Sequence, residues 1–78
     1  MAITRRSARF GQLAGDVDQL LTERGLSVAP HVVDVVLNER IADVAALLGI
    51  SARASLDLTP ATLPRSVADA ITEAASSI

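Results

Sequence analysis

Arginine is the residue type with the clearest chemistry in this chain. All seven basic residues are arginine, and Arg5, Arg6 and Arg9 fall within the first ten residues, which contain no acid. Arg53 and Arg65 stand further along. A guanidinium group forms paired hydrogen bonds with phosphate oxygens or with the acceptor edge of guanine, which an ammonium group does not. These positions indicate contacts with nucleic acid or with an acidic protein surface; a solvated basic tail is the plainer alternative.

The other reactive residue types form no catalytic or metal-binding pattern. His31 is the only histidine, and the chain has no cysteine, which excludes disulfide frameworks and thiolate metal sites. Asp34, Glu39 and Asp43 share helical spacing, but a solvated acidic face explains them more simply than a cation site. The sequence favours caps and turns over nucleophiles for Ser51, Ser55, Thr59 and Ser66, since a nucleophile needs a general base beside it. We therefore expect no enzyme activity, no metal and no cofactor.

Length and composition indicate one small globular unit. The chain has 78 residues, 50% of them hydrophobic, which is enough for one modest core. Its single aromatic residue argues against a stacking platform for single-stranded nucleic acid. After the three arginines of residues 1–10, the rest carries four arginines against nine acids. We expect a flexible basic arm over residues 1–9 and a single helical domain over residues 10–78.

Apolar residues recur at three- and four-residue steps, which predicts an all-α fold. A first helix is expected to begin near Ser7 and to end at Gly25, a residue suited to the left-handed position after a helix. Gly11 and Gly15 lie inside this helix on one side, where another helix could approach closely.

The region after Pro30 has two interpretations. Proline suits the first turn of a helix, and a short helix is expected to precede Asn38, which would cap a new helix from Glu39. The alternative is one helix from Pro30 to Leu48, because the apolar spacing continues without a break. With a short helix capped by Ser51 and a last helix from residue 64 or 65, we expect a compact bundle of four or five short helices.

Residues 41–51 have the pattern of a helix–turn–helix corner. Ala45 is small where a second helix would cross above it, and Gly49 is placed to reverse the chain with a positive φ. Ile50 would fill the corner, and Ser51 would cap the second helix. The residues that this geometry directs toward the core are Val44 and Leu48.

This stretch resembles the amino-terminal helix–turn–helix of lactose-repressor-like regulators, whose pattern "DVA…GVS" appears here as Asp43-Val44-Ala45 and Gly49-Ile50-Ser51. The resemblance covers about twenty residues. It departs from the family at Ser55, where the family has a core-facing valine or isoleucine six residues after the turn glycine. A plain corner between two helices is the alternative. The resemblance implies sequence-specific binding to duplex DNA, with the second helix in the major groove.

On this interpretation, the first turn of the second helix, the arm and one later arginine contact DNA. Arg53 is the only side chain of that helix able to pair with guanine. Arg65 would contact a phosphate, and the arm would follow the backbone or enter the minor groove. The candidate DNA-binding residues are Arg5, Arg6, Arg9, Ser51, Arg53, Ser55 and Arg65.

A homodimer is expected, because four or five phosphate contacts per protomer bind weakly. An apolar seam along the last helix could form the dimer or partner interface, although burial against the chain's own core explains it equally well. The seam consists of Val67, Ala70, Ile71 and Ala74, with Ile78 beyond them.

Two functions follow from these observations. The first is a small cytoplasmic DNA-binding regulator, such as an antitoxin or a plasmid or phage repressor; no secretory signal or membrane-length apolar run is present in the sequence. The alternative is a helical protein–protein interaction module without DNA affinity, docking through an apolar face within residues 32–48 or 67–78. The negative net charge of the chain favours this alternative.

Overall fold

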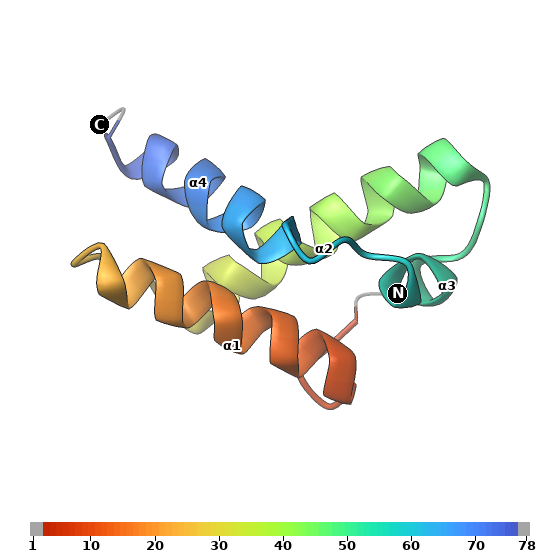
Figure 1. The fold of residues 1–78 in the computed structure, drawn as a ribbon, viewed down its shortest axis with the longest axis horizontal. Helices are drawn as coiled ribbons and strands as arrows, with labels where there is room; N and C mark the ends of the chain where they lie inside the picture. Colours follow the sequence, from red (N-terminus) through yellow and green to blue (C-terminus); the bar gives the residue numbers. More distant parts are fainter. Residues whose placement is uncertain (1–2, 77–78) are drawn as a thin grey trace.

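The computed structural model describes residues 3–76, and in that range the chain is all-α, with four helices and no strand (Figure 1). This confirms the predicted fold class. The helices are α1 (Ala8–Glu23), α2 (Pro30–Leu48), α3 (Ala52–Asp57) and α4 (Leu63–Ser76).

Helix α1 begins and ends where its local chemistry predicts. The Ser7 hydroxyl accepts a hydrogen bond from the amide of Phe10 and caps the first turn. Gly25 follows the helix with a φ of +73°. The buried face of α1 consists of Phe10, Leu13, Ala14, Val17 and Leu21.

Helix α2 is continuous, so the preferred expectation of a break at Asn38 is wrong and the single-helix alternative is right. The side chain of Asn38 does not cap a helix; its Nδ2 donates to the carbonyl of Asp34 within the same helix, at 2.9 Å. The helix continues because its apolar stripe is uninterrupted across this position. The buried members of that stripe are Val33, Leu37, Ile41 and Ala45.

Helix α4 packs mainly on α1, and α2 contacts both (Figure 1). Val67 and Ile71 of α4 are buried in the core that these helices share. They are therefore unavailable as a dimer or partner seam, which corrects that expectation. Ala70 is half-buried and Ala74 exposed; Ile78 lies outside the described residues.

Residues 3–7, which we call the amino-terminal strap, lie against the helices. Ile3 packs on the core, its amide donates to Asn38 Oδ1 at 2.8 Å, and its carbonyl accepts from Asn38 Nδ2 at 2.9 Å. The expectation of a flexible arm over residues 1–9 is thus wrong for residues 3–9. Residues 3–7 are anchored, residues 8–9 belong to α1, and residues 1–2 lie outside the described range.

Gly11 lets the strap pass close to α1. A Cβ at this position would lie 3.0 Å from the carbonyl oxygen of Arg5, so a larger residue would push the strap away. A Cβ at Gly15 would meet nothing within 4 Å. The close approach expected at these two glycines therefore occurs only at Gly11, and the approaching segment is the strap instead of a helix.

Candidate nucleic-acid interface

The chain reverses at Gly49, between α2 and α3. Gly49 has φ +68° and ψ 32°, the left-handed conformation that glycine adopts without steric cost. The amide of Ile50 donates back to the carbonyl of Ala45 at 3.0 Å, which closes the end of α2. The predicted tight turn is present at the predicted residue.

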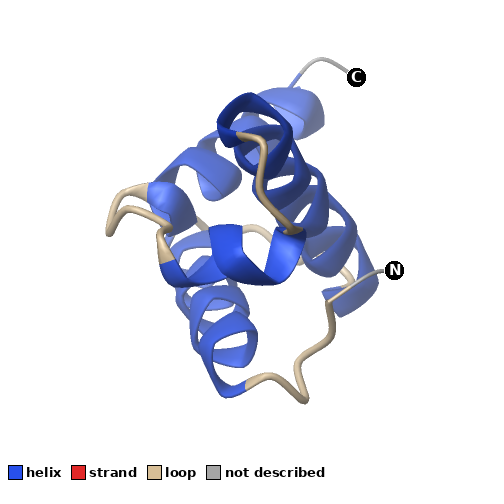
Figure 2. Cartoon of the chain, turned by 90° about the vertical axis from the view of Figure 1, so that its right-hand side faces the viewer, coloured by secondary structure: helices blue, strands red, loops and turns tan. Residues whose placement is uncertain are grey.

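Helix α3 begins immediately after this turn and lies across one end of the molecule. Ser51 accepts a hydrogen bond from the amide of Ala54 at 3.2 Å and so caps α3 as predicted. Ala45 is only 6% exposed, and α2 and α3 contact each other. In Figure 2, which views this end of the molecule, α3 lies toward the viewer together with the last turns of α2. Its outer side is therefore open to a large ligand.

Ser55 faces inward, which corrects its prediction as a DNA contact. The residue is 0% exposed, and its Oγ donates to the carbonyl of Ile41 in α2 at 3.1 Å. It stands where the resembled family places a core-facing valine or isoleucine, and the hydrogen bond satisfies the buried hydroxyl. The position faces the core, although a hydroxyl gives no apolar signal in the sequence.

The last turn of α2 projects beyond the core. Leu48 is 54% exposed and Leu47 85% exposed, while Val44 is half-buried. The expectation that Leu48 faces the core is therefore wrong. Figure 1 shows the cause, since the carboxyl end of α2 extends past α4 and α1 toward α3. Leu58, directly after α3, is also 64% exposed.

Three of the five predicted arginines lie near α3. Arg53 is exposed on α3 and makes no hydrogen bond or ion pair within residues 3–76. Arg9 lies near the end of α3, because its Nη2 donates to Thr59 Oγ1 at 3.3 Å. Arg6 is exposed at the start of α1. These three lie toward the end of the molecule that carries α3.

Arg65 lies elsewhere. It lines a shallow groove with acidic residues of α1, among them Asp16 and Glu23. The structure therefore does not bring Arg65 together with Arg53, although the sequence places both near the predicted corner.

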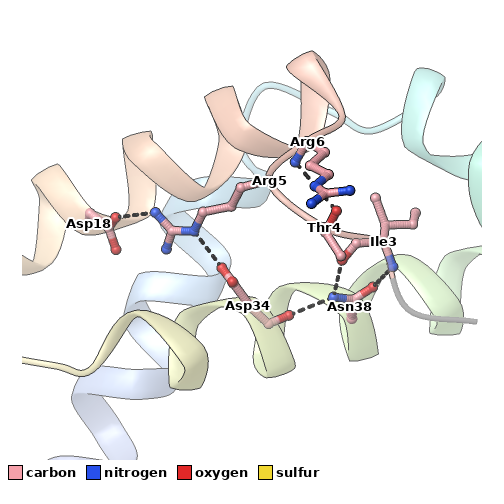
Figure 3. A network of polar contacts seen from close by, with 7 residues as sticks. All are labelled: Ile3, Thr4, Arg5, Arg6, Asp18, Asp34 and Asn38. Atoms are coloured by element: carbon pink, nitrogen blue, oxygen red, sulfur yellow. Dashed lines mark hydrogen bonds and ion pairs between the residues drawn. The ribbon is translucent and has the colours of Figure 1, made fainter.

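Arg5 is held by two acids of the body (Figure 3). Its Nη1 lies 2.9 Å from Asp18 Oδ2 in α1, and its Nε lies 2.8 Å from Asp34 Oδ1 in α2. Hydrogen bonds with Asp18 and then Asp34 raise the pKa of Arg5 above its ordinary value. Sequence reasoning missed these pairs, because partners 13 and 29 residues away leave no local pattern.

The described residues contain no cluster of three or more acids and histidine arranged to hold a metal ion. None of the helices between residues 3 and 76 is long and apolar enough to cross a membrane. No protein-family model, no curated protein and no solved structure matches the chain.

Proposed function

We propose that this chain is a small module that binds duplex DNA, with α3 presented to the major groove. The observation that carries the proposal is the left-handed turn at Gly49, which leaves α3 on the surface with an unpaired arginine at its second position. A short helix held outward in this way is the element that helix–turn–helix proteins insert between the DNA backbones.

The buried Ser55 supports this proposal. A plain corner between two helices does not require the sixth residue after the glycine to point into the core, whereas a helix–turn–helix does. Ser55 points there and is tied to Ile41. The register of α3 on α2 is thus the one that turns Arg53 and Ala54 outward.

The charges near α3 assign different roles to the arginines. Arg53 pairs with a guanine, while Arg6 and Arg9 contact flanking phosphates. Asp57, the exposed last residue of α3, repels DNA phosphates at the carboxyl end of the helix. With so few cationic contacts, one protomer binds weakly, and a regulator of the proposed cytoplasmic kind, such as an antitoxin or repressor, would act as a dimer.

A second candidate function is a protein–protein interaction module. It is favoured by the large exposed apolar side chains at the ends of α2 and α3, which a protein partner would cover. These side chains belong to Leu47, Leu48 and Leu58.

Salt titration separates the two candidates. Fluorescence anisotropy of a labelled generic duplex is measured from 20 to about 200 mM salt with the unmodified protein, Arg53→Gln and Arg24→Gln. The control variant Arg24→Gln removes the same charge after the carboxyl end of α1, away from α3, where Arg24 pairs with Asp69. We expect log–log slopes of about −2 to −3 and a larger loss of affinity for Arg53→Gln than for Arg24→Gln. Equal losses would reject α3 as the binding element, and no binding at 20 mM salt would reject DNA binding and favour the protein-interaction function.

A further inference from the structure

The amino-terminal strap is fastened at two points on the same side of α2 (Figure 3). At the first, Asn38 holds both the amide and the carbonyl of Ile3. At the second, Arg5 bridges α1 and α2 through Asp18 and Asp34. Together they hold against the two helices a segment that is neither helix nor strand and that turns at residues 4–7, where the Ser7 amide donates to the Thr4 carbonyl at 3.0 Å.

The second fastening imitates the contact that a phosphate group makes with arginine. Two carboxylate oxygens from different helices lie 2.8 and 2.9 Å from Nε and Nη1, on separate edges of one guanidinium, and a phosphate oxygen accepts the same kind of charge-assisted hydrogen bond at either edge. About a third of the Arg5 side chain is exposed, as are comparable parts of both acids. A phosphate can therefore reach Arg5 without opening the core, and partly exposed ion pairs of this kind are weak and screened by salt.

The strap joins α1 beside the proposed interface. It runs directly into α1, whose first turn contains Arg9, and Arg9 contacts Thr59 just after α3. A released strap would therefore start next to the end of α3. Its arginines would then be free to follow a nucleic-acid backbone that lies on that helix.

We propose that the strap is an autoinhibitory latch, in which Asp18 and Asp34 occupy Arg5 until a nucleic-acid phosphate displaces them. This inference rests on the DNA binding proposed above. Part of the binding free energy is used to open the latch. The apparent affinity for DNA is therefore the affinity of the open state multiplied by the fraction of free molecules that are open. Loosening the latch by mutation therefore raises the affinity for duplex DNA.

Two kinds of variant open the latch by different means. Asn38→Ala removes the anchor of Ile3 without changing the net charge. The double variant Asp18→Asn/Asp34→Asn frees Arg5, and its matched control is Asp16→Asn/Glu23→Gln, which removes equal charge from exposed acids that do not contact the strap. Adding Arg5→Gln to each open variant tests whether Arg5 carries the gain.

The readouts are amide hydrogen exchange at Ile3 and anisotropy with the generic duplex. We expect protection of Ile3 in the free protein, its loss on saturation with DNA, and about three- to tenfold tighter binding by both open variants, abolished by Arg5→Gln. DNA binding with Ile3 still protected, an unprotected Ile3 in the free protein, or an equal gain in the charge control would overturn the latch and leave DNA binding standing. No binding by any variant at 20 mM salt would reject both proposals together.

Discussion

The Ser55 hydroxyl donates to the Ile41 carbonyl across 3.1 Å, at a point where both residues are buried. This hydrogen bond joins α3 to α2 fourteen residues earlier in the chain. Because a short helix such as α3 has little stability of its own, its orientation depends on such contacts with α2. The bond therefore helps to fix which side of α3 faces solvent.

Ser55→Ala should lower the free energy of unfolding by about 1 kcal/mol, the usual net contribution of an intramolecular hydrogen bond. Urea denaturation followed by circular dichroism measures the change. Ser66→Ala is the matched control, because Ser66 is exposed in α4 and its loss should leave stability nearly unchanged. Equal effects of the two substitutions would mean that the buried hydroxyl does not stabilise the corner.

Gly49→Ala and Gly15→Ala should change stability in opposite directions. No atom lies within 4 Å of a Cβ built at either residue, so neither substitution creates a clash. Gly49 has a positive φ, and alanine there should cost about 1–2 kcal/mol. Gly15 lies within α1, where alanine should stabilise by up to about 1 kcal/mol. Melting temperatures that shift in the same direction would contradict the left-handed turn at Gly49.

Gly11→Ala should stabilise the protein less than Gly15→Ala, or destabilise it. Both substitutions raise helix propensity by the same amount. At Gly11, however, the new Cβ would lie 3.0 Å from the carbonyl oxygen of Arg5, and the strap must move to admit it. Thermal denaturation of the two variants compares them directly. Equal gains would show that the strap does not pack on α1 in solution.

The part of the fold that could be predicted from sequence is the part that depends on neighbouring residues. The start of α1 near Ser7, the turn at Gly49 and the cap at Ser51 each rest on contacts within five residues. Their chemistry allows few alternatives, so residue type was sufficient to place them.

The contacts that could not be predicted join residues distant in sequence. Asn38 has the right residue type for a cap, yet it lies within a helix and binds Ile3, 35 residues away. The polar side chain of Ser55 predicts a surface position, because its partner in α2 leaves no trace in the local pattern. Val67 and Ile71 belong to an apolar stripe. The sequence pattern of such a stripe is the same for packing within the chain and for packing on a partner, and here both residues are buried within the chain.

Salt, rather than alkaline pH, should weaken the contacts of Arg5. Its pKa is raised, first by the hydrogen bond with Asp18, so any stability from its charge is complete below the ordinary arginine pKa and is lost only as pH rises through the higher folded value. In urea denaturation at pH 7, Arg5→Gln should cost at most about 1 kcal/mol at 20 mM salt and less at 1 M salt. A difference from the unmodified protein that does not shrink with salt would argue against ion pairing.

Chemical-shift mapping of the ¹⁵N-labelled protein during titration with duplex DNA at 20 mM salt tests the central proposal most directly. If α3 enters the major groove, the largest changes occur at residues 51–54, with smaller ones at Arg6 and Arg9. Changes confined to residues remote from α3, such as those around Arg24, or no change at all, would contradict the proposed interface.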